Sequence, residues 1–174
     1  PQREKVFPGY KVIGQEERAA ATAVVESGIL SRYIGAEHPD FMGGTNVRCF
    51  EEAWANTFQT DHAITLNSAT SGLYAAVGAA GVGPGDEVIV PAFTWIATAN
   101  VVEYLGATPV FCDIDPSTFN IDVNQVESLI TSETKAVLPV HLFGLCADMV
   151  SLSEIAENHG LAIIEDAACA LDAW

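Results

Sequence analysis

Asp166 is a carboxylate placed where the sequence predicts the end of a buried strand. It directly follows a mostly apolar run over residues 161–165, and such a run is typical of a parallel strand covered on both faces. Open parallel sheets bind ligands outside the carboxyl ends of their strands. An acid there can keep a ring nitrogen protonated through a charge-assisted hydrogen bond of about 1.5–3 kcal/mol. The alternative is that Asp166 caps a helix beginning at Ala167.

A group of hydroxyl side chains follows another predicted strand. Residues 67–72 read Asn-Ser-Ala-Thr-Ser-Gly, between a predicted strand and a predicted helix. The free amides and the dipole of a helix N-terminus favour a bound anion, so we predict a phosphate site here. The alternative is that a hydroxyl only caps the helix. The residues of the predicted site are Ser68, Ala69, Thr70 and Ser71.

Trp95, His141 and Tyr33 are further candidates. Trp95 comes four residues after Pro91, which closes a predicted strand, so its indole can stack on a ligand ring; burial in the core is the alternative. His141 ends another predicted strand and is a candidate cofactor or substrate contact, or else a structural histidine. Tyr33 lies in a long loop over residues 28–44 that is either functional or disordered. A phosphate site, a stacking indole and an acid for a ring nitrogen together describe a site for pyridoxal 5'-phosphate.

An alternation of strands and helices must position these groups. Apolar runs predict five strands, over residues 63–66, 87–90, 109–113, 136–140 and 161–165. Helix-length segments separate them, over residues 70–80, 94–105, 123–130 and 149–159. Two further helices are expected before the first strand, over residues 15–27 and 46–58. This order predicts an α/β fold with a parallel sheet.

Composition narrows the class of protein. The 174 residues are 49% apolar, and 7 basic against 23 acidic residues give a formal charge of −16. Such a charge repels nucleic acid and anionic lipid, so we expect neither a nucleic-acid nor a membrane partner. Four widely spaced cysteines indicate free thiols. No signal peptide or membrane-spanning run is evident, so we expect a soluble, cytoplasmic protein.

Two other patterns do not indicate a site. Asp113 and Asp115 flank a predicted strand exit just before Pro116, which favours a turn over a metal pair, and we expect no metal. The Gly-rich stretch over residues 81–86 follows a helix and precedes a strand. This is the reverse of the order that a nucleotide-binding fingerprint requires, so it predicts a turn.

Four segments together resemble the DegT/StrS family of pyridoxal-phosphate-dependent nucleotide-sugar aminotransferases. They are Asn67–Thr70, Gly83–Pro91, Pro139–Gly144 and Ile164–Ala168, which occur in the family's order. The resemblance covers nearly the whole chain. It implies the three-layer αβα large domain of a type I aminotransferase, truncated at its C-terminus.

The resemblance also implies roles for residues and partners. Thr70 and the amide of Ser71 are expected to hold the cofactor phosphate, Trp95 to stack on the pyridine ring, and Asp166 to bind its nitrogen. The implied reaction moves an amino group from glutamate or glutamine to a keto-sugar carried on a nucleotide, as in polysaccharide or antibiotic biosynthesis. The implied assembly is a homodimer.

Two departures from the family pattern affect the expected activity. Cys169 stands where relatives commonly carry Gln or His near the ring hydroxyl, and a thiol is a poorer hydrogen-bonding partner. The lysine that forms the Schiff base in relatives lies beyond Asp166, and no lysine of this chain matches it. We therefore expect an inactive N-terminal fragment of an enzyme. The alternatives are a sugar dehydratase of the same fold and a non-catalytic binding or regulatory remnant.

A division of the chain follows from the resemblance. Residues 1–45 are expected to form an N-terminal helix and an active-site or interface loop. Residues 46–174 are expected to form an incomplete cofactor-binding large domain, with the C-terminal small domain absent.

Overall fold

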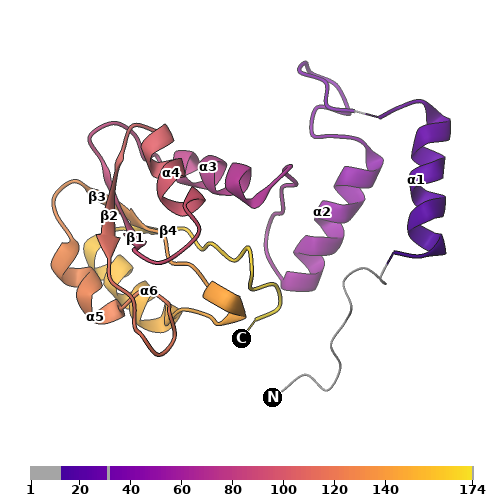
Figure 1. The fold of residues 1–174 in the computed structure, drawn as a ribbon. Coiled ribbons are helices and arrows are strands. Elements are labelled where there is room, and N and C mark those ends of the chain that lie inside the picture. Colours follow the sequence, from indigo (N-terminus) through magenta and orange to yellow (C-terminus); the bar gives the residue numbers. More distant parts are fainter. Residues whose placement is uncertain (1–12, 31, 174) are drawn as a thin grey trace. The chain divides into compact units, whose positions relative to one another are not determined.

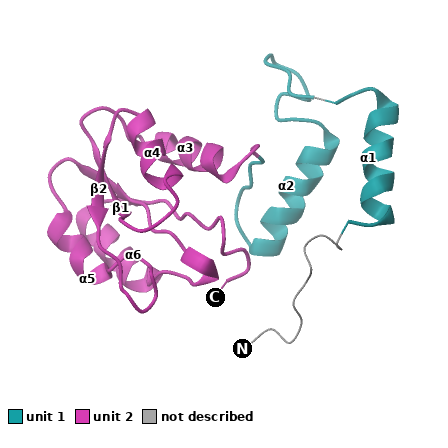
Figure 2. Ribbon diagram, viewed as in Figure 1, with its two compact units in different colours: residues 1–65 teal, residues 66–174 magenta. Residues whose placement is uncertain are grey.

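The computed structural model describes residues 13–30 and 32–173, which form helices and one parallel sheet (Figure 1). The chain divides into two compact units, residues 1–65 and residues 66–174 (Figure 2). The boundary predicted from the sequence lies between residues 45 and 46 instead, and that division into domains stays a prediction.

The first unit contains two helices, α1 (Gln15–Ser27) and α2 (Thr45–Phe58). The Glu17 carboxylate accepts a hydrogen bond from the Gly14 amide at 2.6 Å and so caps the start of α1. Gly28 ends α1 with a φ of 67°, the left-handed conformation that glycine adopts without strain. Both helices agree with the predicted ranges to within one residue.

The second unit is built on a four-stranded parallel sheet. Its strands are β1 (Glu87–Pro91), β2 (Thr108–Cys112), β3 (Thr134–Val137) and β4 (Ala162–Ile163), in the order β2-β1-β3-β4. Its helices are α3 (Ala69–Ala79), α4 (Ala97–Tyr104), α5 (Val123–Val126) and α6 (Met149–His159). Two short 3-10 turns span Glu127–Leu129 and Leu142–Gly144.

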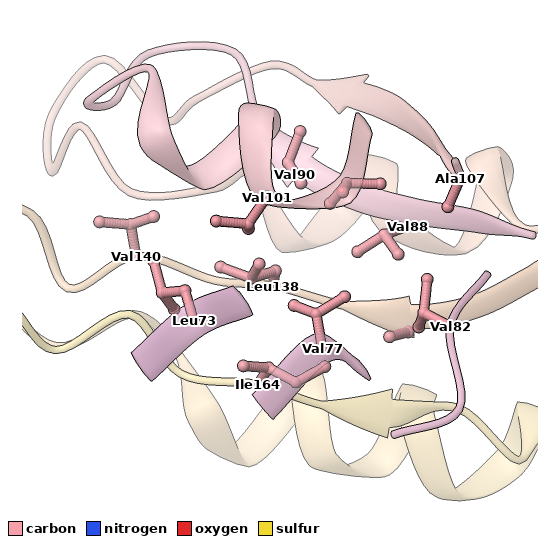
Figure 3. Packing of buried hydrophobic residues seen from close by; sticks show 12 residues of the cluster. Leu73, Val77, Val82, Val88, Val90, Val101, Ala107, Leu138, Val140 and Ile164 are labelled. Carbon is pink, nitrogen blue, oxygen red and sulfur yellow. The ribbon is translucent and has the colours of Figure 1, made fainter. Parts of the chain in front are cut away.

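Alternation along β1 divides the core into two layers. Val88 and Val90 face α3 and α4, where they pack with Val77 and Leu138 (Figure 3). Ile89, between them, belongs to the opposite cluster, which includes residues of α5 and α6. Helices therefore cover both faces of the sheet, which confirms the predicted αβα fold.

One predicted strand is wrong. Residues 63–66 form no strand, and Ile64 and Leu66 are 72% and 50% exposed. A strand exists only through hydrogen bonds to a neighbouring strand, and the described residues provide none for this run. The apolar pattern was recognised, but apolar residues alone do not supply a partner.

Other boundaries moved by a few residues. The helix predicted over 94–105 begins at Ala97, and the strand predicted over 161–165 narrows to two residues, with Val140 and Asp166 forming one more parallel bridge. No helix in the described part of the chain is long and apolar enough to cross a membrane. The cysteines are free: Cys49 and Cys169 are exposed, Cys146 is half-buried and Cys112 is buried.

Candidate active site

Asp166 lies at the carboxyl edge of the sheet with its side chain fixed on both sides. Its backbone amide donates to the Pro139 carbonyl at 2.9 Å, and its carbonyl accepts from the His141 amide at 3.0 Å. One carboxylate oxygen, Oδ1, accepts from the Ala168 amide at 3.2 Å. The other, Oδ2, accepts from the Thr98 hydroxyl at 3.0 Å. No helix begins at Ala167, so Asp166 is not the helix cap that the sequence left open.

Burial makes this carboxylate unusual. The residue is only 7% exposed, yet among the described residues no cation forms an ion pair with it. Buried charges in proteins are normally paired, because leaving water is costly. The site therefore has the chemistry to accept a cationic group from a ligand, and a protonated ring nitrogen fits this requirement.

The N-terminus of α3 carries the predicted phosphate residues. Ser68 is the N-cap, and its hydroxyl oxygen accepts from the Ser71 amide at 3.2 Å. The Ser68 hydroxyl also lies 3.1 Å from the Ser71 hydroxyl. Ala69 and Thr70 form the exposed first turn, where helical amides have no partner inside the helix. The capping role is thus present and uses the Ser71 amide, which the sequence had predicted as a phosphate donor. The amides of Ala69 and Thr70 remain suited to an anion.

Trp95 and Cys169 are both exposed. Trp95 is 75% exposed, so the alternative of a tryptophan buried in the core does not hold. Its carbonyl accepts from the Thr98 amide at 3.1 Å, which fixes the backbone of Trp95 to the start of α4. Cys169 lies beside Gly144, where an added Cβ would come within 3.4 Å of the Cys169 carbonyl oxygen.

His141 is held inside the protein by both ring nitrogens. It is 4% exposed. Nδ1 accepts from the Ala147 amide at 3.1 Å, so in the neutral ring Nε2 carries the proton and donates to Glu165 at 2.8 Å. A contact to a ligand would require the protein to give up one of these bonds. The structural alternative is therefore favoured, although the contact predicted from the sequence stays a prediction.

Tyr33 and Lys135 belong to other segments of the chain than the residues described above. Tyr33 belongs to the first unit, where its hydroxyl lies 3.5 Å from the Thr65 hydroxyl and the residue is 56% exposed. Lys135 is the only lysine among the described residues, and it lies near the amino end of β3, at the opposite end of that strand from the edge where Asp166 lies.

Thr98 was missed by the sequence analysis. It is fully buried, and it contacts both Asp166 and Trp95. Thr94 and Thr98, four residues apart in an otherwise apolar segment, were a signal for a buried hydroxyl facing the sheet.

Comparison with known proteins identifies the family. The profile of the DegT/DnrJ/EryC1/StrS aminotransferase family matches residues 13–174. The chain belongs to this family. The match confirms the resemblance drawn from the four sequence segments.

Individual family members are similar over most of the chain. GDP-perosamine synthase of Caulobacter vibrioides is 53% identical over 124 residues, which are 71% of this chain and 33% of that protein. The solved structure of DesV of S. venezuelae is 42% identical with a TM-score of 0.80, covering 89% of this chain and 39% of that one. The structure of NtdA of Bacillus subtilis, solved with bound cofactor PMP, is 33% identical with a TM-score of 0.80. The match covers 96% of this chain and 37% of NtdA.

The chain thus spans between a third and about two fifths of the length of these relatives.

Proposed function

We propose that the protein is a pyridoxal-phosphate-dependent aminotransferase that moves an amino group from glutamate or glutamine to a nucleotide-linked keto-sugar. Family membership and the similarity to a GDP-perosamine synthase support the reaction and the substrate class. The PMP bound to NtdA supports the cofactor, since PMP is the aminated form of pyridoxal phosphate. When bound, this cofactor supplies an electron sink and a group that takes up and returns the amine.

The observation that carries this proposal is Asp166, a buried carboxylate with two neutral donors and no cation from the described residues. A protonated pyridine nitrogen supplies the missing positive charge. The charge-assisted hydrogen bond keeps the ring protonated, and that protonation makes the ring an electron sink.

The remaining residues take roles consistent with their places. The start of α3, with Ser68, Ala69, Thr70 and Ser71, holds the cofactor phosphate by amides and hydroxyls. The exposed indole of Trp95 stacks on the ring. Cys169 would take the place near the ring hydroxyl, and His141 and Tyr33 are the candidate further contacts.

Charge supports an assembly in which another chain completes the site. Lys135 is the only lysine or arginine of residues 66–174, so this unit offers almost no cation to a substrate diphosphate. We propose that cations from elsewhere, including a second copy in a homodimer, neutralise that diphosphate. Because Lys135 lies at the opposite end of β3, the amine that carries the cofactor is proposed to lie outside residues 13–174.

Two reactions on the protein as its gene encodes it test the proposal. The protein is first loaded with pyridoxal phosphate and mixed with glutamate or glutamine, and conversion of the cofactor to PMP is followed by absorbance. A nucleotide-linked keto-sugar is then added with ¹⁵N-labelled donor, and the product is weighed by mass spectrometry. We expect the sugar to gain the labelled amine. Loss of water without label would instead indicate the dehydratase, and cofactor binding without either conversion would indicate a non-catalytic protein.

A further inference from the structure

Thr98 is a fully buried polar residue with a partner far away in the sequence. It lies in the first turn of α4, and its relative exposure is 0%. Its hydroxyl donates to Asp166 Oδ2 at 3.0 Å, a bond between residues 68 positions apart. A buried hydroxyl needs a hydrogen-bond partner, and Thr98 uses the Asp166 carboxylate rather than a group that is near in the sequence.

Helical threonines commonly donate to the carbonyl four residues earlier. Thr57 in α2 does so, with its hydroxyl 2.7 Å from the Ala53 carbonyl. At Thr98 the group four residues earlier is Thr94, and the hydroxyl of Thr94, rather than its carbonyl, lies 3.5 Å away. The Thr98 hydroxyl can accept from Thr94 while it donates to the carboxylate. Its geometry is thus directed away from its own helix and towards Asp166.

Thr98 also fixes Trp95 through the backbone. The Thr98 amide donates to the Trp95 carbonyl at 3.1 Å. Thr98 therefore bonds both to the backbone of Trp95, whose indole is proposed to cover the ring, and to the carboxylate that is proposed to bind the ring nitrogen. Ala168 holds the other carboxylate oxygen, so the two donors together set the rotation of the Asp166 carboxylate.

We propose that Thr98 is a positioning residue for the cofactor ring, and this rests on the proposed function. Its hydroxyl orients the Asp166 carboxylate towards the ring nitrogen, and its amide fixes the backbone that carries Trp95. Each carboxylate oxygen has a second lone pair, so the donors from Thr98 and Ala168 leave an acceptor position for the ligand. Removing the hydroxyl frees the carboxylate to rotate, and the bond to the ring nitrogen weakens.

The test compares variants of the protein as its gene encodes it. The probe is pyridoxamine phosphate, which carries an amine in place of the aldehyde and so binds without attachment to a lysine. Thr98→Val keeps the side-chain shape and removes the hydroxyl, whereas Thr98→Ser keeps the hydroxyl. Thr57→Val removes a hydroxyl that bonds only within its own helix and serves as the matched control. Affinity is measured by calorimetry, the ring's protonation by the absorbance of the bound probe, and folding by thermal unfolding.

Thr98→Val is expected to bind the probe about tenfold more weakly, which is the change expected when one charge-assisted hydrogen bond is lost. The absorbance of the bound ring should change as well. Thr98→Ser should restore most of the affinity and the original absorbance, and Thr57→Val should change neither. If Thr98→Val does not fold, Thr98→Cys, which keeps the size but is a weak donor, replaces it.

Unchanged affinity and absorbance in a folded Thr98→Val or Thr98→Cys protein would overturn the positioning role, even if the unfolding temperature fell. Failure of the unaltered protein to bind the probe would refute the proposed function itself, and the role of Thr98 with it. Probe binding by the unaltered protein therefore distinguishes a failure of the proposed function from a failure of the role of Thr98.

Discussion

Replacing Asp166 by asparagine is expected to weaken cofactor binding without weakening the ligand-free fold. The asparagine keeps the shape of the side chain, and its oxygen can still accept from the Ala168 amide, now 3.2 Å from Oδ1. Its amide nitrogen takes the place of Oδ2, 3.0 Å from the Thr98 hydroxyl. That hydroxyl can rotate to accept from the new amide and to donate to the Thr94 hydroxyl 3.5 Å away, so Thr98 keeps its hydrogen bonds.

The two expected magnitudes have opposite signs. In the ligand-free protein the substitution removes a charge from a residue that is 7% exposed, so we expect stability to be equal or up to about 2 kcal/mol higher. With the ligand, it removes a charge-assisted hydrogen bond of about 1.5–3 kcal/mol, so affinity should fall about 10- to 150-fold.

Calorimetric titration with pyridoxamine phosphate and thermal unfolding with and without this ligand measure both effects. Asp172→Asn is the matched control, because Asp172 is exposed and belongs to the same C-terminal segment. The assignment of Asp166 to the ring nitrogen is refuted if Asp166→Asn binds the ligand as tightly as the unaltered protein. A ligand-free Asp166→Asn protein that unfolds several degrees earlier would show instead that the carboxylate is a structural anchor.

Three further predictions concern the fold of the second unit. Leu138→Ala removes a fully buried side chain between the sheet and α3, and chemical denaturation should show a loss of about 2–5 kcal/mol. Burial, followed by the negative charges of Asp122 and Asp113, raises the pKa of Cys112 from 9.0 to about 11. The thiol therefore stays neutral in the folded protein at pH values where it has ionised in the unfolded chain. The free energy of unfolding should fall between pH 9 and 11 by at most about 1.4 kcal/mol per pH unit. The Cys112→Ala protein should lack this dependence. Hydrogen bonds from the Ser151 side chain and amide lower the pKa of Asp148 below 3.8. The ionised Asp148 carboxylate therefore stabilises the fold above pH 3.8, and this effect is lost as the pH falls through the lowered pKa. The free energy of unfolding of Asp148→Asn, measured in acid, should depend less on pH.

The sequence predicted best the elements whose hydrogen-bond partners lie nearby in the chain. α1 and α6 match their predicted ranges, because helix hydrogen bonds are local and Gly28 and Gly160 provide end signals. The run over residues 63–66 had the same apolar character as the true strands, yet a strand depends on a distant neighbour that a single sequence does not reveal.

The candidate site shows the same division. Asp166, Trp95 and Ser68 were predicted as candidates because each was expected to follow a strand or to open a helix, and parallel strands bring the residues at their carboxyl ends to one edge. Thr98 was not found, because its importance depends on one hydrogen bond across the fold. His141 was found as a candidate, but the sequence could not show that Ala147 and Glu165 would occupy both of its nitrogens.

Charge links these observations to the chemistry proposed for the site. A chain with a formal charge of −16 would repel a phosphorylated ligand unless the ligand's charges meet specific partners. The start of α3 offers neutral amides and hydroxyls to the proposed phosphate, so that this group could be bound without a cationic side chain. Asp166 is one of the 23 acidic residues already counted in that charge, and it is buried, so a positive group from a ligand would compensate it. An acid in that place is unfavourable for a neutral ring and favourable for a protonated one, so the residue that is proposed to bind the ring would also select the protonation state that the proposed chemistry requires.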